Sequence, residues 1–278
     1  MQIGFLTAPF RNEPLEQVVA WASENGFDAL EVASGPGSKH IDTDQAVAGK
    51  ADDYVKLFRN YNVTISSLAW YSNLLEGDAA KRAELAATFK RIVDAAAMMR
   101  IPVVCTMAGF PVAGKSKLQT IQEDFAEVFP PLVAYAKGKG VQIAFENYFR
   151  TNLQGLDTWD KVFEVCPDEN LGLNFDPSHL YHMEVDYLEA VDRYASRIFH
   201  THAKDTEVRQ HVKRYVGTLG DGWWRYVIPG YGDIDWGVYI ARLKRNGYDG
   251  VLSIEHEDGA LGREEGMIKG RQHLAQFA

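Results

Sequence analysis

Residues 138–147, Gly-Lys-Gly-Val-Gln-Ile-Ala-Phe-Glu-Asn, contain the unit from which the fold of this chain is predicted. Glycine is typical of helix ends, and residues 141–145 read as a continuous apolar strand of the kind that is buried on both faces. Strands of that kind belong to parallel sheets covered by helices. Glu146 and Asn147 follow directly, so polar side chains are expected where the strand ends.

The same unit repeats along the chain, as a short apolar strand followed by a helix with an apolar stripe at i, i+3, i+4 and i+7. The expected strands are residues 3–7, 29–33, 63–69, 102–106, 141–145, 171–175, 198–201 and 251–254. Eight strands alternating with helices predict an α/β fold, a single (β/α)₈ barrel domain over residues 1–278. A doubly wound sheet is the alternative, because periodicity does not show closure.

One connection is much longer than the others. Residues 205–235 show no clear period, whereas a connection of ~2–6 residues is usual in such folds. The segment contains Trp223 and Trp224. Long loops that follow barrel strands lie at the C-terminal mouth, so we expect this one to cover the site. The alternative is a surface excursion or an oligomer contact.

Composition and charge narrow the class of protein. The chain is 46% hydrophobic and 24% charged, which is ordinary for a globular protein. Its 29 Lys and Arg against 38 Asp and Glu give a net charge of −9, which argues against nucleic acid as a partner. Cys105 and Cys166 are too few for a disulfide framework. With no signal-like start and no run of ~20 apolar residues, we expect a cytoplasmic protein without a membrane partner.

Polar side chains follow four consecutive strands, at the end where barrel active sites lie. These strand-end segments are Glu146-Asn147, Asp176-Pro177-Ser178-His179, His202-Ala203-Lys204-Asp205 and Glu255-His256-Glu257. Three carboxylates packed together need a counter-charge, and a divalent cation supplies it. Three oxygen donors and one nitrogen suit Mn²⁺, Mg²⁺ or Co²⁺, with Zn²⁺ left open. Taken singly, each carboxylate could equally be a solvated group or a helix cap.

Several motifs resemble those of the xylose isomerase-like barrel superfamily, which includes sugar (phosphate) isomerases and epimerases, inosose dehydratase and endonuclease IV. The matching segments are Phe145-Glu-Asn147, Asn174-Phe-Asp-Pro-Ser-His179, His200-Thr-His-Ala-Lys-Asp205, Pro229-Gly-Tyr-Gly-Asp-Ile-Asp-Trp236 and Gly247-Tyr-Asp-Gly-Val-Leu-Ser-Ile-Glu255. The resemblance spans nearly the whole chain and implies Glu146, Asp176, His202 and Glu255 as metal ligands. It also implies His179 as a substrate contact, and in the ketose 3-epimerase branch Glu146 and Glu255 as the proton-transfer pair.

Two further residues, Lys204 and His200, are interpreted by their spacing from His202. Lys204 lies two residues after His202 and shares its face, which makes it a candidate for binding a substrate hydroxyl or an enolate oxygen. A structural ion pair with Asp205 is the alternative. We interpret His200 and His202 as pointing to opposite faces, with His202 lining the mouth and His200 packed against the surrounding helices.

Four other residues are candidates for contacting a substrate. His40 and Trp70 follow the second and third strands, where a packed aromatic ring or a solvated histidine is the alternative interpretation. Trp223 and Trp224 lie in the long connection, and aromatic faces stack on the C–H surfaces of sugars. A small-molecule carbohydrate is therefore the expected partner, and assembly into a homo-oligomer stays open.

These features favour a divalent-metal isomerase or epimerase acting on a keto sugar through an enediolate. The close alternative is a dehydratase or lyase of keto sugars or keto-inositols, which needs the same ligands and an added acid such as His179 or Lys204. An endonuclease IV-like repair enzyme is disfavoured, because the charge of −9 opposes DNA binding and the larger zinc-ligand set of that branch is not evident. Intact ligands argue against a non-catalytic sugar-binding protein.

Overall fold

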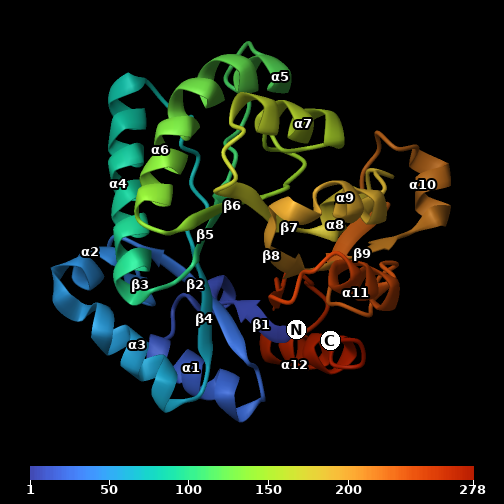
Figure 1. The fold of residues 1–278 in the computed structure, drawn as a ribbon. Coiled ribbons are helices and arrows are strands. Elements are labelled where there is room, and N and C mark those ends of the chain that lie inside the picture. Colours follow the sequence, from blue (N-terminus) through green and yellow to red (C-terminus); the bar gives the residue numbers. More distant parts are fainter.

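The computed structural model describes the whole chain, Met1–Ala278, and its eight central strands close into a parallel barrel (Figure 1). The barrel strands are β1 (Gln2–Leu6), β2 (Ala29–Gly35), β4 (Thr64–Ala69), β5 (Val103–Met107), β6 (Gln142–Glu146), β7 (Leu171–Phe175), β8 (Ile198–Ala203) and β11 (Val251–Ile254). They follow one another in this order, and β1 pairs in parallel with both β2 and β11, which closes the ring. The predicted (β/α)₈ fold is confirmed, and an open doubly wound sheet is excluded.

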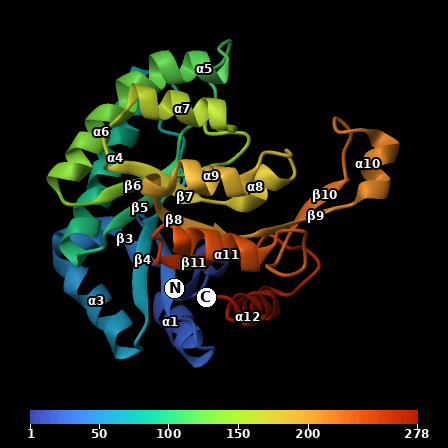
Figure 2. The same cartoon turned by 45° about the vertical axis from the view of Figure 1, so that its right-hand side comes forward.

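Helices surround the barrel on its outside, except α10, which projects away from it (Figures 1 and 2). They are α1 (Leu15–Glu24), α2 (Thr43–Gln45), α3 (Ala51–Asn60), α4 (Ala79–Met99), α5 (Lys117–Thr120), α6 (Ala126–Gly138), α7 (Leu156–Val165), α8 (Pro177–Tyr181), α9 (Tyr187–Arg193), α10 (Gln210–Val216), α11 (Trp236–Arg245) and α12 (Arg263–Leu274). Single 3₁₀ or π turns occur at η1 (Ala8–Phe10), η2 (Ala46–Lys50), η3 (Ile121–Phe125) and η4 (Ala195–Arg197). A short strand, β3 (Ile41–Asp42), pairs in parallel with the end of β2. None of the helices has the length and apolar character that crossing a membrane requires.

The main core lies between the barrel strands and the helices. Several helices begin at aspartates whose side chains accept backbone N–H groups of the first turn, among them Asp78 for α4, Asp186 for α9 and Asp235 for α11. Their apolar faces then pack on the strands; Tyr239 and Ile240 of α11, for example, are buried. The strands are thereby covered from outside, as their apolar sequences predict.

The inside of the barrel carries a polar layer. Glu31 of β2 pairs in register with Ser67 of β4, and Ser253 of β11 pairs with His202 of β8. All four side chains are buried. Because alternate residues of a barrel strand point inward, these groups face one another across the barrel below its mouth.

The long connection after β8 is not an irregular loop. Residues 205–227 form an antiparallel ribbon of β9 (Asp205–Val208) and β10 (Trp224–Val227), with α10 between the two strands. We call these residues the arm, and Figure 2 shows it extending away from the barrel. Sequence analysis missed the ribbon because its strands contain four residues each, too few to establish a period.

Candidate functional site

Three carboxylates converge at the C-terminal mouth of the barrel. Glu146 is the last residue of β6, Asp176 follows β7 and caps α8, and Glu255 follows β11. One carboxylate oxygen from each of the three residues and a ring nitrogen of His179 all lie within 4.8 Å of one another. The three carboxylates named from the sequence are therefore brought together, and His179 joins them.

His202 approaches the same carboxylates from β8. Its Nδ1 lies 3.3 Å from Glu146 Oε1, 3.4 Å from Glu255 Oε2 and 3.9 Å from Asp176 Oδ2. Its other nitrogen, Nε2, lies 2.9 Å from Glu31 Oε2. The ring thus presents Nδ1 to the carboxylate cluster, as expected for the fourth donor of the set.

The ammonium group of Lys204 lies among these carboxylates and is almost completely buried, with 1% of the side chain exposed. Its Nζ donates to Glu255 Oε2 and lies 3.2 Å from Asp176 Oδ2 and 3.1 Å from Glu257 Oε2. The alternative ion pair with Asp205 does not form, because the carboxylate of Asp205 accepts backbone N–H groups and the indole N–H of Trp236 instead.

Charge compensation keeps the carboxylates ionised. Burial alone would raise the pKa of Glu255, but Lys204 and His202 bring it down to about 2. Burial likewise opposes ionisation of Glu146, and hydrogen bonds from His179 and His202 hold the pKa of its carboxyl well below the ordinary value. The site therefore presents negatively charged oxygens to any group that enters it.

The donor set fits a divalent cation. Oδ2 of Asp176 is a buried carboxylate oxygen that accepts no hydrogen bond, and its nearest charged partner is the Lys204 ammonium at 3.2 Å. Carboxylate oxygens with one imidazole nitrogen match the ligands that Mn²⁺, Mg²⁺, Co²⁺ and Zn²⁺ accept. Glu146, Asp176, His202 and Glu255 are thus able to hold such an ion.

His179 connects the carboxylates to the arm. Its Nε2 lies 3.2 Å from Glu146 Oε1 and 3.2 Å from Lys204 Nζ, while Nδ1 lies 2.6 Å from the hydroxyl of Tyr226 on β10. The ammonium of Lys204 also lies over the ring of Tyr226, 4.6 Å from its centre. Sequence analysis missed Tyr226; its position two residues after Trp224, on the same face of a strand, was the available signal.

The two tryptophans of the arm lie beside the site and do not contact the carboxylates. Trp224 stacks on His182 with ring centres 3.9 Å apart, and Trp223 packs under Lys213. Both line a groove of about 910 Å³ between the arm, α5, α7 and the residues that follow α8, together with Phe149. The arm therefore contributes a groove wall, and Tyr226 is its contact with His179.

His40 and Trp70 are not brought to the carboxylate cluster. Both ring nitrogens of the buried His40 are engaged, by Thr7 Oγ1 at 2.9 Å and by the carbonyl of Phe10 at 3.1 Å. Trp70 packs on Phe89 of α4 with ring centres 6.2 Å apart. The residue that reaches the site from this region is Tyr71, whose hydroxyl donates to Glu31 and lies 3.3 Å from His202 Nε2.

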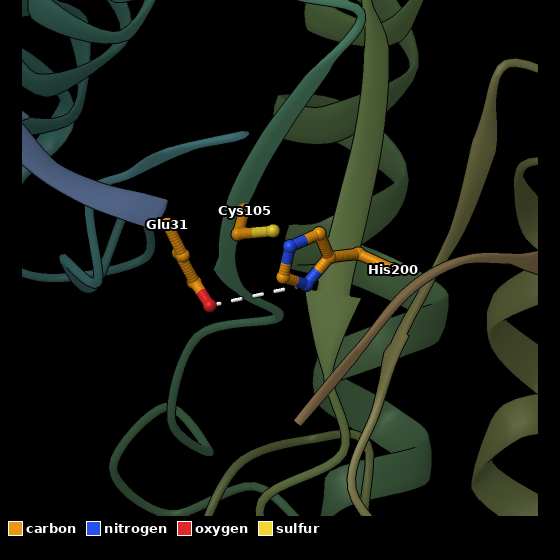
Figure 3. Close-up of side chains that lie close together, drawn as sticks. All are labelled: Glu31, Cys105 and His200. Carbon is orange, nitrogen blue, oxygen red and sulfur yellow. Dashed lines mark ion pairs between the residues drawn. The ribbon is translucent and has the colours of Figure 1, made fainter. Parts of the chain in front are cut away.

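The interpretation of His200 was wrong. Residues two apart on a strand share a face, so His200 points into the barrel as His202 does, and not toward the helices. Its Nδ1 lies 2.9 Å from Asn174 Oδ1, and its Nε2 lies 3.1 Å from Ser66 Oγ. Figure 3 shows His200 beside Glu31 and Cys105 in the barrel interior.

A closed barrel with carboxylate and imidazole donors at its mouth defines a (β/α)₈ protein with the residues for a divalent-cation site. Within that class the match is specific. Residues 19–277 match the model of the family described as xylose isomerase-like TIM barrel, and the chain belongs to that family.

Two relatives illustrate the range of similarity. The chain is 26% identical to the uncharacterized protein YfiH of Bacillus subtilis over an alignment of 311 positions, gaps included, which covers 99% of each chain. It is 32% identical to the inosose dehydratase of Clostridium perfringens over 159 residues, which cover 54% of this chain and 53% of the relative.

Solved structures share the fold along the full length of the chain. The IolI protein with a bound zinc atom has a TM-score of 0.78 at 20% identity, covering 100% of this chain and 99% of that one. The 3-keto-D-glucoside 4-epimerase YcjR of E. coli has a TM-score of 0.72 at 16% identity, covering 98% and 99%. The enzymes named among these relatives and neighbours are thus a dehydratase and an epimerase.

Proposed function

We propose that this chain is a divalent-metal-dependent isomerase or epimerase that acts on a keto sugar through an enediolate. The observation that carries the proposal is the convergence of Glu146, Asp176 and Glu255 on Nδ1 of His202, with distances of 3.3, 3.9 and 3.4 Å. The three buried carboxylates, with one imidazole nitrogen beside them, support a cation at this point.

A cation held by Glu146, Asp176, His202 and Glu255 would supply Lewis acidity, polarising a ketone so that the neighbouring C–H becomes acidic. The carboxylate-rich donor set favours Mn²⁺, Mg²⁺ or Co²⁺. Zinc, found in the IolI neighbour, is also compatible with the set.

The proposal assigns proton transfer to Glu146 and Glu255. They come from β6 and β11, which are separated in the barrel by β7 and β8. One carboxylate takes the proton from the carbon next to the ketone, and the other returns a proton to the opposite face of the same carbon. Lys204, beside Glu255, stabilises negative charge on the substrate oxygen as it develops.

A dehydratase is the second candidate, and a specific arrangement favours it. Loss of a hydroxyl from the enediolate needs an acid at the leaving oxygen. Lys204 and His179 lie 3.2 Å apart beside the carboxylates, and Tyr226 is hydrogen-bonded to His179. The similarity to an enzyme named inosose dehydratase, over about half of each chain, points the same way.

The experiment that tests the proposal follows hydrogen exchange. The protein is loaded with Mn²⁺ and incubated in D₂O with a panel of ketoses, their phosphates, 3-keto-glycosides and keto-inositols, with EDTA-treated protein as the control. Deuterium on the carbon next to the ketone of an epimer or isomer supports the first candidate, and loss of water supports the second. Neither exchange nor product across the panel, with the metal bound, contradicts both.

A further inference from the structure

Glu31 is a buried carboxylate that touches the back of His202. It lies on β2 with no side-chain exposure, and its Oε2 is 2.9 Å from His202 Nε2, although 171 residues separate the two in sequence. An ionised carboxylate only accepts hydrogen bonds, so Nε2 carries the proton and donates it. The other nitrogen, Nδ1, faces the carboxylates at the mouth and is hydrogen-bonded to Glu146 in the metal-free protein, so any proton it carries must leave before it binds a cation.

Glu31 is itself held in place by groups from several strands. The hydroxyl of Tyr71 donates to its Oε1 at 2.7 Å, and Ser253 Oγ donates to its Oε2 at 2.9 Å. Asn174 continues the network by donating to the hydroxyl of Tyr71 at 2.8 Å. Both oxygens of Glu31 therefore have fixed donors, and neither the carboxylate nor the imidazole it contacts is free to rotate without breaking hydrogen bonds.

From these contacts we propose that Glu31 is a positioning residue, which fixes the ring orientation and tautomer of His202 so that Nδ1 is presented to the metal. The proposal rests on the proposed metal site and goes beyond it, because Glu31 contacts none of the three carboxylates. A partner on the second nitrogen of a ligand histidine typically raises metal affinity 10–100-fold.

A second metal site at Glu31, Cys105 and His200 is the competing interpretation. Their donor atoms lie within 4.8 Å of one another (Figure 3). The nitrogens of His200 are already engaged by Asn174 and Ser66, and the oxygens of Glu31 by Tyr71, Ser253 and His202. This cluster is a satisfied hydrogen-bond network, so it needs no ion.

The test measures Mn²⁺ binding by titration of the metal-free protein in four variants. Glu31→Leu removes both acceptors, and we expect it to weaken Mn²⁺ binding 10–100-fold while the stoichiometry stays at one ion. Glu31→Gln keeps one acceptor oxygen, so it should bind Mn²⁺ with an affinity between those of Glu31→Leu and wild type. Cys105→Ala changes the same buried cluster without touching His202 and should bind as wild type does. Asp176→Ala should lose the ion.

The outcomes separate this proposal from the proposed function. Unchanged affinity in both Glu31 variants, with binding lost in Asp176→Ala, overturns the positioning role and leaves the metal site intact. Equal binding by wild type and Asp176→Ala overturns the metal site and the positioning role together. Two ions per chain, one of them lost in Cys105→Ala, also overturns the proposal. If Glu31→Leu does not fold, as judged by circular dichroism, Glu31→Gln decides, because it preserves side-chain size.

Discussion

The hydroxyl of Tyr226 lies 2.6 Å from Nδ1 of His179, and this hydrogen bond joins the projecting arm to the carboxylate cluster. It fixes which nitrogen of the imidazole ring points at Glu146, because the other nitrogen, Nε2, lies 3.2 Å from that carboxylate. The arm therefore takes part in the site through a tyrosine, although its tryptophans are the more conspicuous residues in the sequence.

Tyr226→Phe should lower kcat about tenfold, the value of a hydrogen bond of roughly 1–1.5 kcal/mol to a group that must keep its orientation. Metal content should not change, since Tyr226 lies on the far side of His179 from the carboxylates. Steady-state kinetics of Tyr226→Phe and of Tyr231→Phe, a change at a tyrosine that is 48% exposed, provide the comparison. Equal kcat values in the two variants would refute a role for this hydrogen bond.

The strand-end carboxylates could be predicted from sequence, and the supporting residues could not. Glu146, Asp176 and Glu255 each follow an apolar run directly, and in a parallel barrel all such positions meet at one mouth. Glu31 lies inside a strand, so its inward direction depends on the barrel being closed. A charged residue within an apolar strand was the available signal. Tyr226 lies in strand β10, which has too few residues to show a period.

His200 shows a different kind of error. Its strand was predicted correctly, and the mistake was in treating residues two apart as if they pointed to opposite faces. With the correct period, His200, His202 and Lys204 all point inward, as the structure shows from their contacts with Asn174, Glu31 and Glu255.

Lys204→Met should destabilise the metal-free protein strongly. The variant leaves the buried carboxylates around Nζ without their ammonium counter-charge, and uncompensated buried charge costs about 3–5 kcal/mol. Mn²⁺ should restore part of the loss, so the rise in Tm on adding Mn²⁺ should be larger in the variant than in wild type. Thermal unfolding with and without Mn²⁺ measures this. Lys56→Met, at an exposed position of α3, is the control. A Mn²⁺-induced rise in Tm that is no larger in Lys204→Met than in wild type would contradict the account.

His182 should make stability depend on pH. Burial, with repulsion from His179, lowers the pKa of His182 to about 4. The unfolded chain takes up this proton near pH 6.5 and the folded chain does not, so stability falls as the pH drops from about 6.5 to about 4.

His182→Phe keeps a ring against Trp224 and removes the titration. Between pH 7 and pH 4, wild type should lose about 3 kcal/mol more free energy of unfolding than the variant does. Denaturant unfolding at the two pH values gives the difference. Parallel pH profiles would show that His182 is protonated in the folded protein as readily as in the unfolded chain.

Gly172 allows β7 to pass close to the segment before β8. A Cβ atom at this position would lie 2.2 Å from the carbonyl oxygen of Arg197 and 2.4 Å from the ring of Phe199. Gly172→Ala should therefore cost about 3 kcal/mol. Gly138→Ala on α6, where no atom lies within 4 Å, should be neutral or stabilising by up to about 1 kcal/mol. Chemical denaturation of both variants tests this. Similar free energies of unfolding would contradict the prediction and show that the backbone near Gly172 shifts to accommodate a Cβ atom.

The central claim is that Glu146 and Glu255 move protons at a bound metal, and their glutamine variants test it most directly. Glu→Gln keeps an oxygen donor for the metal and removes the basic oxygen, so metal affinity should fall modestly while turnover falls on the order of 10²–10⁴-fold.

The decisive measurement is deuterium exchange from D₂O into the substrate that turns over, carried out with Mn²⁺-loaded wild type, Glu146→Gln and Glu255→Gln. We predict that each variant binds Mn²⁺ and blocks net conversion, and that at least one still exchanges the proton of a single epimer, because each glutamate serves its own face. Near-normal turnover in both variants with the metal bound would contradict the account.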